Sequence, residues 1–328
     1  MSRKFLIDTD TASDDAVALL MALRQPDVDV LAITIVSGNV SVEQGARNAL
    51  YSAELCGSQT PVFLGASRPL LREPIFAHFF HGRDGLGDQD YPPPRGAPGQ
   101  EHAVDVLIET IRSNPGIVLV TLGPLTNIAV AVKHCPEIVS KVGRCVVMGG
   151  AACTVGNVTP AAEYNIWVDP EAARVVFGAG LPIEMVGWEL CRNEANLNEE
   201  EMAHVRSLDT PLAHFALDCN RTAIEANRRL FGEPGLSLPD PVAMGIALEP
   251  DLCTRRSSHY VEVETQGEFT RGMTVVDALN VAVQERNRVW QPTVARGHKA
   301  SVCWEIDVPR WKKMLYRALG PEELPAAR

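Results

Sequence analysis

Short apolar runs alternate with amphipathic stretches over the first two-thirds of this 328-residue chain. The runs have the length of buried strands, and the stretches have helical periodicity, as in Asp14–Arg24. A β-α-β-α order predicts an α/β fold, with a mostly parallel open sheet and helices on both faces. From about Asn196 onward the sequence predicts a more helical final third.

The expected elements follow this alternation. The predicted strands are Phe5–Ile7, Val28–Val36, Pro61–Leu64, Ile117–Leu122, Arg144–Met148 and Ile183–Val186. The predicted helices are Asp14–Arg24, Val42–Leu55, Ala103–Ile111, Leu125–Lys133 and Pro170–Phe177. Two further strands are expected near Tyr260–Glu264 and Gly272–Val276. Since no repeat or linker interrupts the chain, one domain over residues 1–328 is expected.

A long irregular segment, Gly65–Gly99, is rich in Gly, Pro, His and Asp. Loops of this length in a compact domain are often functional, so we expect a flap near a site, with a short helix around Ile75–Phe80.

Bulk composition excludes several classes of partner. The net charge of −11, from 30 basic and 41 acidic residues, disfavours nucleic acid and anionic membrane surfaces. The eight cysteines form no C-x-x-C pair and are interpreted as free thiols in a reducing compartment. No apolar segment is long enough to cross a bilayer, so a cytoplasmic location is expected.

Polar clusters follow several of the predicted strands: Asp8–Asp15, Ser37–Asn39, Leu122–Asn127 and Met148–Asn165. Ligands of open α/β sheets bind beyond the carboxyl ends of the strands. These clusters therefore predict one composite site at that edge.

The first cluster is strongly acidic. Asp8, Asp10, Asp14 and Asp15 follow a buried strand, and no Lys or Arg occurs between Phe5 and Leu23. Buried carboxylates repel one another and lose hydration, so a cation must offset their charge. All-oxygen ligands indicate a hard divalent metal, Ca²⁺ or Mg²⁺.

Other interpretations of the cluster explain fewer residues. Asp14 and Asp15 could complement the positive end of a helix, but this leaves Asp8 and Asp10 unexplained. An EF-hand counted from Asp10 would need Gly where Asp15 stands. Asp8-Thr9-Asp10-Thr11 also resembles the first motif of haloacid-dehalogenase-like phosphatases, but the later elements of that family are not evident.

A series of motifs along most of the chain resembles the inosine–uridine nucleoside hydrolase family. In order they are Asp8-Thr-Asp-Thr-Ala-Ser-Asp-Asp-Ala16, Ser37-Gly-Asn-Val40, Thr121-Leu-Gly-Pro-Leu-Thr-Asn-Ile-Ala129, Met148-Gly-Gly150, Gly156-Asn157, Glu163-Tyr-Asn165, Asp169-Pro-Glu171 and Leu238-Pro-Asp-Pro241. By this resemblance the chain is expected to be an N-ribohydrolase that cleaves the N-glycosidic bond of ribonucleosides, in a homo-dimer or homo-tetramer.

The resemblance also implies a role for each site residue. Those matched to Ca²⁺ are Asp10, Asp15, the main-chain carbonyl of Thr126, and Asp240. Those matched to the substrate are Asp14, Asn39 and Asn165 at the ribose 2′ and 3′ hydroxyls, Asn157 and Glu163 at the 5′ end, and Met148 beneath the sugar. Asp10 also matches the general base that activates water, and Asp8 is expected to support its neighbours.

The base-binding end departs from the family. Many members carry His before the last Asp, where it is associated with protonating the leaving base, but here Pro239 stands there. His81 is a candidate replacement, and further candidates for the base end are His78, Arg221, Glu225 and Trp188, although an indole is often core packing. This departure leaves open a riboside-binding protein without catalysis, and the preferred base is not predicted.

Overall fold

The computed structural model describes residues 2–230, 232 and 234–321. Its main sheet has eight strands in the order β3-β2-β1-β4-β5-β6-β10-β7. The bounds are β1 (Arg3–Thr9), β2 (Val28–Ile35), β3 (Val62–Leu64), β4 (Ile117–Thr121), β5 (Val142–Met148), β6 (Ile183–Val186), β7 (Cys253–His259) and β10 (Ala300–Ile306). All neighbours pair in parallel except β7 and β10, which are antiparallel. The predicted α/β class and the six predicted sheet strands are confirmed.

The strands expected near residues 260 and 274 also form, but outside the main sheet. They are β8 (Val261–Val263) and β9 (Thr274–Val276), which pair antiparallel with each other. The sequence analysis did not predict β7 and β10, which complete the sheet at one edge.

The described helices include all those predicted, with small shifts at their ends. They are α1 (Ser13–Leu23), α2 (Val42–Leu55), α3 (His78–His81), α4 (Ala103–Ser113), α5 (Thr126–His134), α6 (Tyr164–Val168), α7 (Pro170–Phe177), α8 (Glu199–Ser207), α9 (Pro211–Asp218), α10 (Arg221–Leu230), α11 (Pro239–Leu248), α12 (Gln291–Arg296) and α13 (Val308–Leu319). The short helix expected at Ile75–Phe80 is α3, which begins at His78. Segment 65–99 is otherwise irregular, as expected for a flap.

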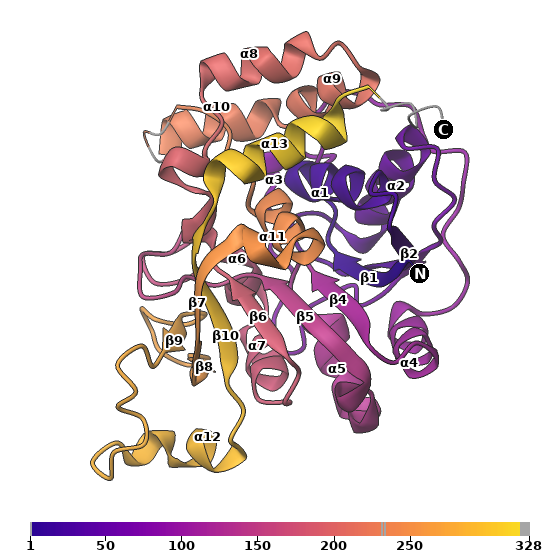
Figure 1. Cartoon of the computed structure of the whole chain (residues 1–328). Helices are drawn as coiled ribbons and strands as arrows, with labels where there is room; N and C mark the ends of the chain where they lie inside the picture. Colours follow the sequence, from indigo (N-terminus) through magenta and orange to yellow (C-terminus); the bar gives the residue numbers. More distant parts are fainter. Residues whose placement is uncertain (1, 231, 233, 322–328) are drawn as a thin grey trace, which may run out of the picture.

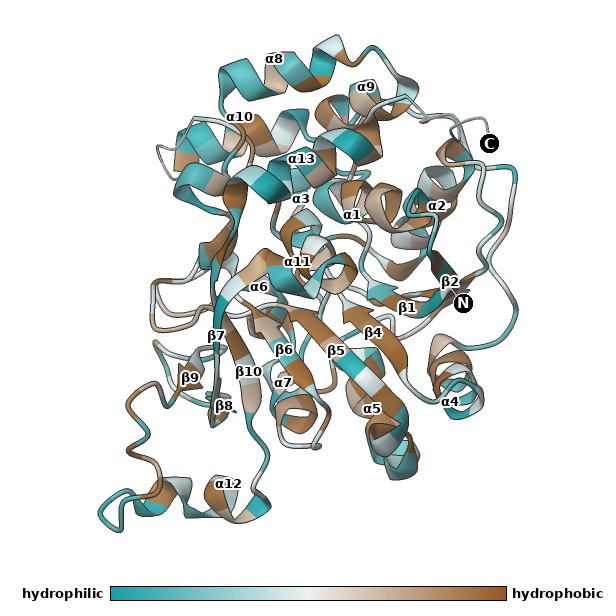
Figure 2. Ribbon diagram, viewed as in Figure 1, coloured by the Kyte–Doolittle hydropathy of each residue, from teal (hydrophilic) through white to brown (hydrophobic). Residues whose placement is uncertain are grey.

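Helices cover both faces of the sheet (Figure 1). In β1, Phe5 and Ile7 pack into one apolar cluster with α1, α2 and α11, while Leu6 packs into a second cluster with α4, α5 and α7. Successive strand side chains point to opposite faces, so a strand buried on both sides must be apolar throughout. Figure 2 shows this pattern, with hydrophobic central strands and hydrophilic residues on the outer helices α8 and α13.

This packing brings distant segments to the carboxyl end of β1. Helix α1 lies against α11, so the loop after β1 meets the first turn of α11. The turn itself requires an unusual backbone, since Thr11 has φ +23°.

All eight cysteines are free thiols, as expected. No described helix is long and apolar enough to span a membrane.

Candidate active site

A cavity opens at the carboxyl ends of the central strands. Nine residues singled out from the sequence line it: Asp14, Asn39, His81, Met148, Asn157, Glu163, Asn165, Trp188 and Asp240. They come from the first turn of α1, the loop after β2, the flap, the end of β5 and the segment from there into α6, the segment after β6, and α11. The structure therefore brings together residues that are more than 200 positions apart in the sequence.

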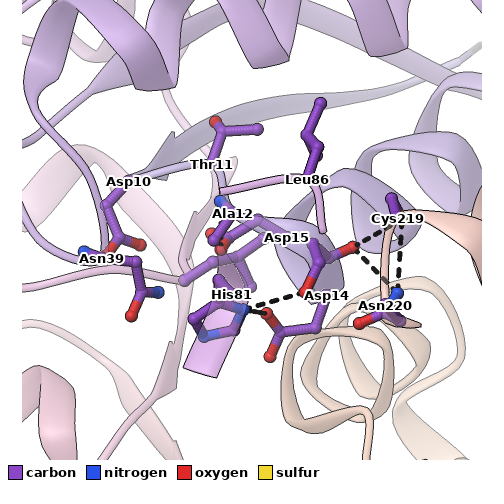
Figure 3. Close-up of polar contacts among 12 residues, drawn as sticks. Asp10, Thr11, Ala12, Asp14, Asp15, Asn39, His81, Leu86, Cys219 and Asn220 are labelled. Atoms are coloured by element: carbon purple, nitrogen blue, oxygen red, sulfur yellow. Dashed lines mark hydrogen bonds and ion pairs between the residues drawn. The ribbon is translucent and has the colours of Figure 1, made fainter. Parts of the chain in front are cut away.

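The loop from β1 to α1 and the first turn of α1 carry two acids, Asp10 and Asp15, which lie next to the cavity-lining Asn39 and Asp14. Asp15 accepts hydrogen bonds from the Ala12 N–H at 2.9 Å and from the Thr9 hydroxyl at 2.5 Å. Asp10 lies beside the β2 loop and accepts the Asn39 N–H at 2.5 Å (Figure 3). These bonds fix two fully buried carboxyl groups before any ligand binds.

Three carboxyl groups converge here. Ligand oxygens of Asp14, Asp15 and Asp240 lie within 4.8 Å of one another, and all three residues are buried. Among the described side chains, one oxygen each of Asp10, Asp14 and Asp240 is buried without a hydrogen-bond partner. The aspartates predicted as metal ligands were Asp10, Asp15 and Asp240. The three that converge here include Asp14 in place of Asp10, and Asp10 lies beside them.

Burial and mutual proximity disfavour the ionised forms of these carboxyl groups, and a bound cation would offset that cost. Burial, then repulsion from neighbouring acids, holds the pKa values of Asp10 and Asp240 well above their usual range. Burial is also the main cause that raises the pKa of Asp14 and of Asp15 to about 6. Unpaired carboxylate oxygens converging in a buried site fit a divalent metal bound through oxygen. Thr126 is buried beside this region and its hydroxyl donates to Asp169 at 2.7 Å, so the ligand role of its carbonyl stays a prediction.

A wall of amides and one acid, Glu163, faces these aspartates. Glu163 caps α6 and accepts the N–H groups of Gly150 at 2.8 Å and Asn165 at 2.9 Å, and burial raises the pKa of its carboxyl to about 7. The Asn165 amide donates to the Leu122 carbonyl at 2.7 Å and contacts Met148 Sδ at 3.3 Å. The wall is thus built from the ends of β4 and β5 and from α6.

Two residues support the wall and the converging aspartates from behind. Asp8 accepts hydrogen bonds from Thr34 at 2.6 Å and Asn127 at 2.8 Å, so it links β1 to β2 and α5. The Tyr164 hydroxyl donates to the carbonyl of either Gly38, at 2.9 Å, or Ile75, at 2.6 Å, in the flap. Sequence reasoning missed Tyr164, although it stands inside the Glu163-Tyr-Asn165 motif.

His81 closes the cavity from the flap. Its Nδ1 lies 2.8 Å from the Ser13 hydroxyl and 3.7 Å from Asp14 (Figure 3). Burial lowers the pKa of this imidazole to about 4, so the ring is neutral near pH 7. The role of His81 in protonating a leaving base stays a prediction.

The far end of the cavity is largely apolar. Trp188 lines it, and the indole N–H donates to the Val155 carbonyl at 2.8 Å. The ring therefore forms part of the cavity surface and also anchors the neighbouring loop. Lining residues that sequence reasoning missed or left unassigned are Ala77, Phe79, Phe80, Val158, Cys191, Asn227, Leu230 and Ser237, together with Pro239. Most of these residues stand outside the quoted motifs, on α3, on α10 and in the loop before α11. A single sequence shows no pattern in these segments that would assign them to a site.

The fold and the buried acidic cavity define an α/β enzyme of the nucleoside hydrolase type. Residues 5–313 match the sequence model of the family described as inosine-uridine preferring nucleoside hydrolase, and the chain belongs to this family. It is an N-ribohydrolase, as its motifs predicted.

Individual relatives agree with this assignment. An uncharacterised protein of Schizosaccharomyces pombe is 38% identical over 294 residues, covering 89% of this chain and 94% of the relative. The pyrimidine-specific ribonucleoside hydrolase RihA of Escherichia coli is 39% identical over 280 residues, covering 84% and 89%.

Solved structures give the same result. A plant nucleoside hydrolase, PpNRh1, superposes with a TM-score of 0.91 at 31% identity, covering 98% of this chain and all of that one. A purine-preferring ribonucleoside hydrolase from Gardnerella vaginalis superposes with a TM-score of 0.84 at 32% identity, covering 97% and 98%. The alternatives of a phosphatase and of a non-catalytic riboside-binding protein are not favoured by these relationships.

Proposed function

We propose that this chain hydrolyses ribonucleosides to ribose and free base with the help of one Ca²⁺ ion. The observation that supports this most is the buried group of Asp14, Asp15 and Asp240, in which Asp14 and Asp240 line an amide-lined cavity and each has an oxygen without a hydrogen-bond partner. Seven or eight oxygens from carboxylates, a carbonyl, water and sugar hydroxyls would suit Ca²⁺. Asp10, Asp15, Asp240 and the Thr126 carbonyl would hold it, with Asp14 close enough to take part.

Bound there, Ca²⁺ would supply positive charge that acidifies water and attracts the vicinal hydroxyls of a ribose. Asp10 would take the proton of the attacking water, since its free oxygen stands beside the other acids. As the C1′–N bond breaks, positive charge grows on the sugar, as in glycoside hydrolysis. The surrounding carboxylates stabilise that charge.

The cavity wall would orient the sugar. Asp14, Asn39 and Asn165 would bind the secondary hydroxyls, and Asn157 and Glu163 the 5′ hydroxyl. These pairs of amide and carboxyl groups suit a polyol because they both donate and accept hydrogen bonds. Met148 would lie beneath the ring. A cytoplasmic homo-dimer or homo-tetramer remains part of this proposal.

Release of ribose tests the function directly. With Ca²⁺ and a panel of purine, pyrimidine and pyridinium ribosides, we expect reducing sugar and free base to appear in equal amounts. Asp10→Ala should lower kcat at least about 10³-fold, because the proton acceptor is lost, while circular dichroism stays unchanged. Substantial turnover by Asp10→Ala contradicts the assigned base. Turnover of p-nitrophenyl phosphate, with no ribose from any riboside, contradicts the proposed reaction.

A further inference from the structure

We propose that the base-binding end of this cavity selects ribosides whose base already carries a positive charge on the ring. This class comprises N-ribosyl pyridinium and N-alkylated purine ribosides. The inference rests on the proposed riboside hydrolysis and names the substrate class of the same site.

The geometry of the base end supplies apolar and aromatic surface. The lining residues there include Phe79 and Phe80 from α3, Trp188 after β6, and Leu230 at the end of α10. Among the described lining residues none is Lys or Arg. Arg192, whose guanidinium lies 4.5 Å from the Trp188 ring centroid, is not one of the lining residues.

The polar groups at this end are already engaged within the protein. The Ser237 hydroxyl donates to Asn196 Oδ1 at 2.7 Å, and the Cys191 thiol lies 2.9 Å from the Trp188 carbonyl. The Asn227 amide faces the Gly235 carbonyl at 3.4 Å. Hydroxyl, thiol and amide groups held in this way are poor acids toward a leaving base.

Pro239 occupies the position next to the cation-binding acid. It is the first residue of α11, lines the cavity and precedes Asp240 directly. A proline has no N–H and no titratable side chain, so it cannot donate a proton. His81, the other candidate, directs Nδ1 to Ser13 and Asp14 on the sugar side.

A charged base removes the need for this proton. When the C1′–N bond of a ribosyl pyridinium breaks, its electron pair neutralises the positive ring nitrogen, and the base leaves as a neutral molecule. Water adds its oxygen to C1′ and gives one proton to Asp10, so riboside cation and water become ribose, neutral base and H⁺. An uncharged nucleoside must instead release an anionic base or acquire a proton. That difference corresponds to about 10²–10⁴ in rate when no general acid is present.

The base end also suits a flat cation. Phe79, Phe80 and Trp188 place aromatic rings there. A positive ring beside aromatic faces gains a favourable cation–π interaction. A flat aromatic cation therefore matches the apolar and aromatic surface of this end of the cavity.

Steady-state kinetics test this preference in the wild-type enzyme with Ca²⁺. We expect kcat/KM for nicotinamide riboside to exceed that for uridine and inosine by at least about 100-fold. The pair 7-methylguanosine and guanosine, which differ by one methyl group and one charge, should show the same order. Values for uncharged and charged ribosides within about tenfold of each other overturn the proposal.

Pro239→His separates the role of the enzyme from the lability of the substrate. Since bond lability belongs to the substrate, it cancels when the charged-to-uncharged ratio is compared between wild type and variant. Restoring a proton donor should raise kcat/KM for uridine or inosine at least about tenfold and change that for nicotinamide riboside much less. An unchanged ratio in folded Pro239→His contradicts the proposal. If this variant does not fold, the ratio of kcat/KM for charged and uncharged ribosides in the wild-type enzyme tests the proposal by itself.

His81→Ala provides the second comparison. Loss of activity on uncharged nucleosides alone would reveal His81 as a proton donor and overturn the proposal, whereas a parallel change on both classes supports it.

These measurements also separate the leaving-group inference from the proposed riboside hydrolysis. Ribose released equally well from uncharged nucleosides refutes only the leaving-group inference, whereas no ribose from any riboside refutes the proposed function as well.

Discussion

At the scale of single residues, Asp10 depends on glycines that leave it room. A Cβ on Gly38 would lie 2.0 Å from Asp10 Oδ2 and 2.8 Å from Pro124 Cδ. Such distances are far below van der Waals contact, so either the carboxyl group or the β2 loop must move. The sequence motif Ser37-Gly-Asn39 therefore has a steric reason, which is the close approach of the main chain to the Asp10 carboxyl group.

Gly38→Ala should consequently lower kcat/KM by at least about 10²-fold, because a displacement of about 1 Å at a reacting group is costly. The thermal unfolding midpoint should fall by only a few degrees if the loop gives way locally. Gly96→Ala is the matched control, since its Cβ would meet only Leu50 and Glu54 at 3.5 and 3.7 Å. Comparable activity of Gly38→Ala and the control would show that Asp10 tolerates displacement.

At the scale of elements, Tyr164 couples helix α6 to the flap and to the end of β2. Its hydroxyl lies within hydrogen-bond distance of the carbonyls of Gly38 and Ile75. Both carbonyls belong to segments that border the cavity. When this hydroxyl donates to Ile75, it ties the flap to the wall of amides and Glu163 described above.

Tyr164→Phe should loosen this connection. We expect a loss of about 1 kcal/mol in the free energy of unfolding, the usual contribution of one hydrogen bond, together with a raised KM. Hydrogen exchange of residues 65–99 should become faster than in wild type. Tyr91→Phe is the control, because the Tyr91 hydroxyl is buried with no partner among the described residues, and its removal should not destabilise. Unchanged flap exchange in Tyr164→Phe would contradict the coupling.

The elements also show what the sequence could and could not predict. Strands β1, β2, β4, β5 and β6 were predictable because burial on both faces of the sheet requires apolar runs. Strand β7 was not, since its sequence, Cys253-Thr-Arg-Arg-Ser-Ser-His259, is exposed between its two buried ends. An edge strand of this kind has no apolar pattern to recognise.

The candidate site divides in the same way. Its acidic and amide half lies in short motifs at strand ends, so the parallel topology was sufficient to bring these residues together. Its largely apolar half comes from α3, α10 and the segment before α11, where Asn227 and Leu230 belong to no motif. Their convergence depends on tertiary packing in the helical final third.

At the scale of the whole molecule, the buried acidic cluster links folding to pH. Without a metal, the carboxyl groups of Asp14 and Asp15 have pKa values of about 6, above the ordinary 3.8. A raised pKa in the folded state means that folding favours the protonated form. The resulting stability is present at low pH and is lost as the pH rises through about 6.

Calcium should reverse this trend, because it binds the ionised form of the same groups. After treatment with a chelator, the protein should have a lower thermal midpoint at pH 7.5 than at pH 5.0. Saturating Ca²⁺ should raise the midpoint strongly at pH 7.5, by the equivalent of about 2.7 kcal/mol at a concentration 100 times Kd, and only weakly at pH 5.0. Differential scanning calorimetry at the two pH values, with chelator or Ca²⁺, measures both effects. In Asp240→Asn, which keeps the shape of the side chain but removes its charge, the shift caused by Ca²⁺ should shrink at pH 7.5. A Ca²⁺ shift of equal size at both pH values, or one retained in Asp240→Asn, would place the ion elsewhere in the protein.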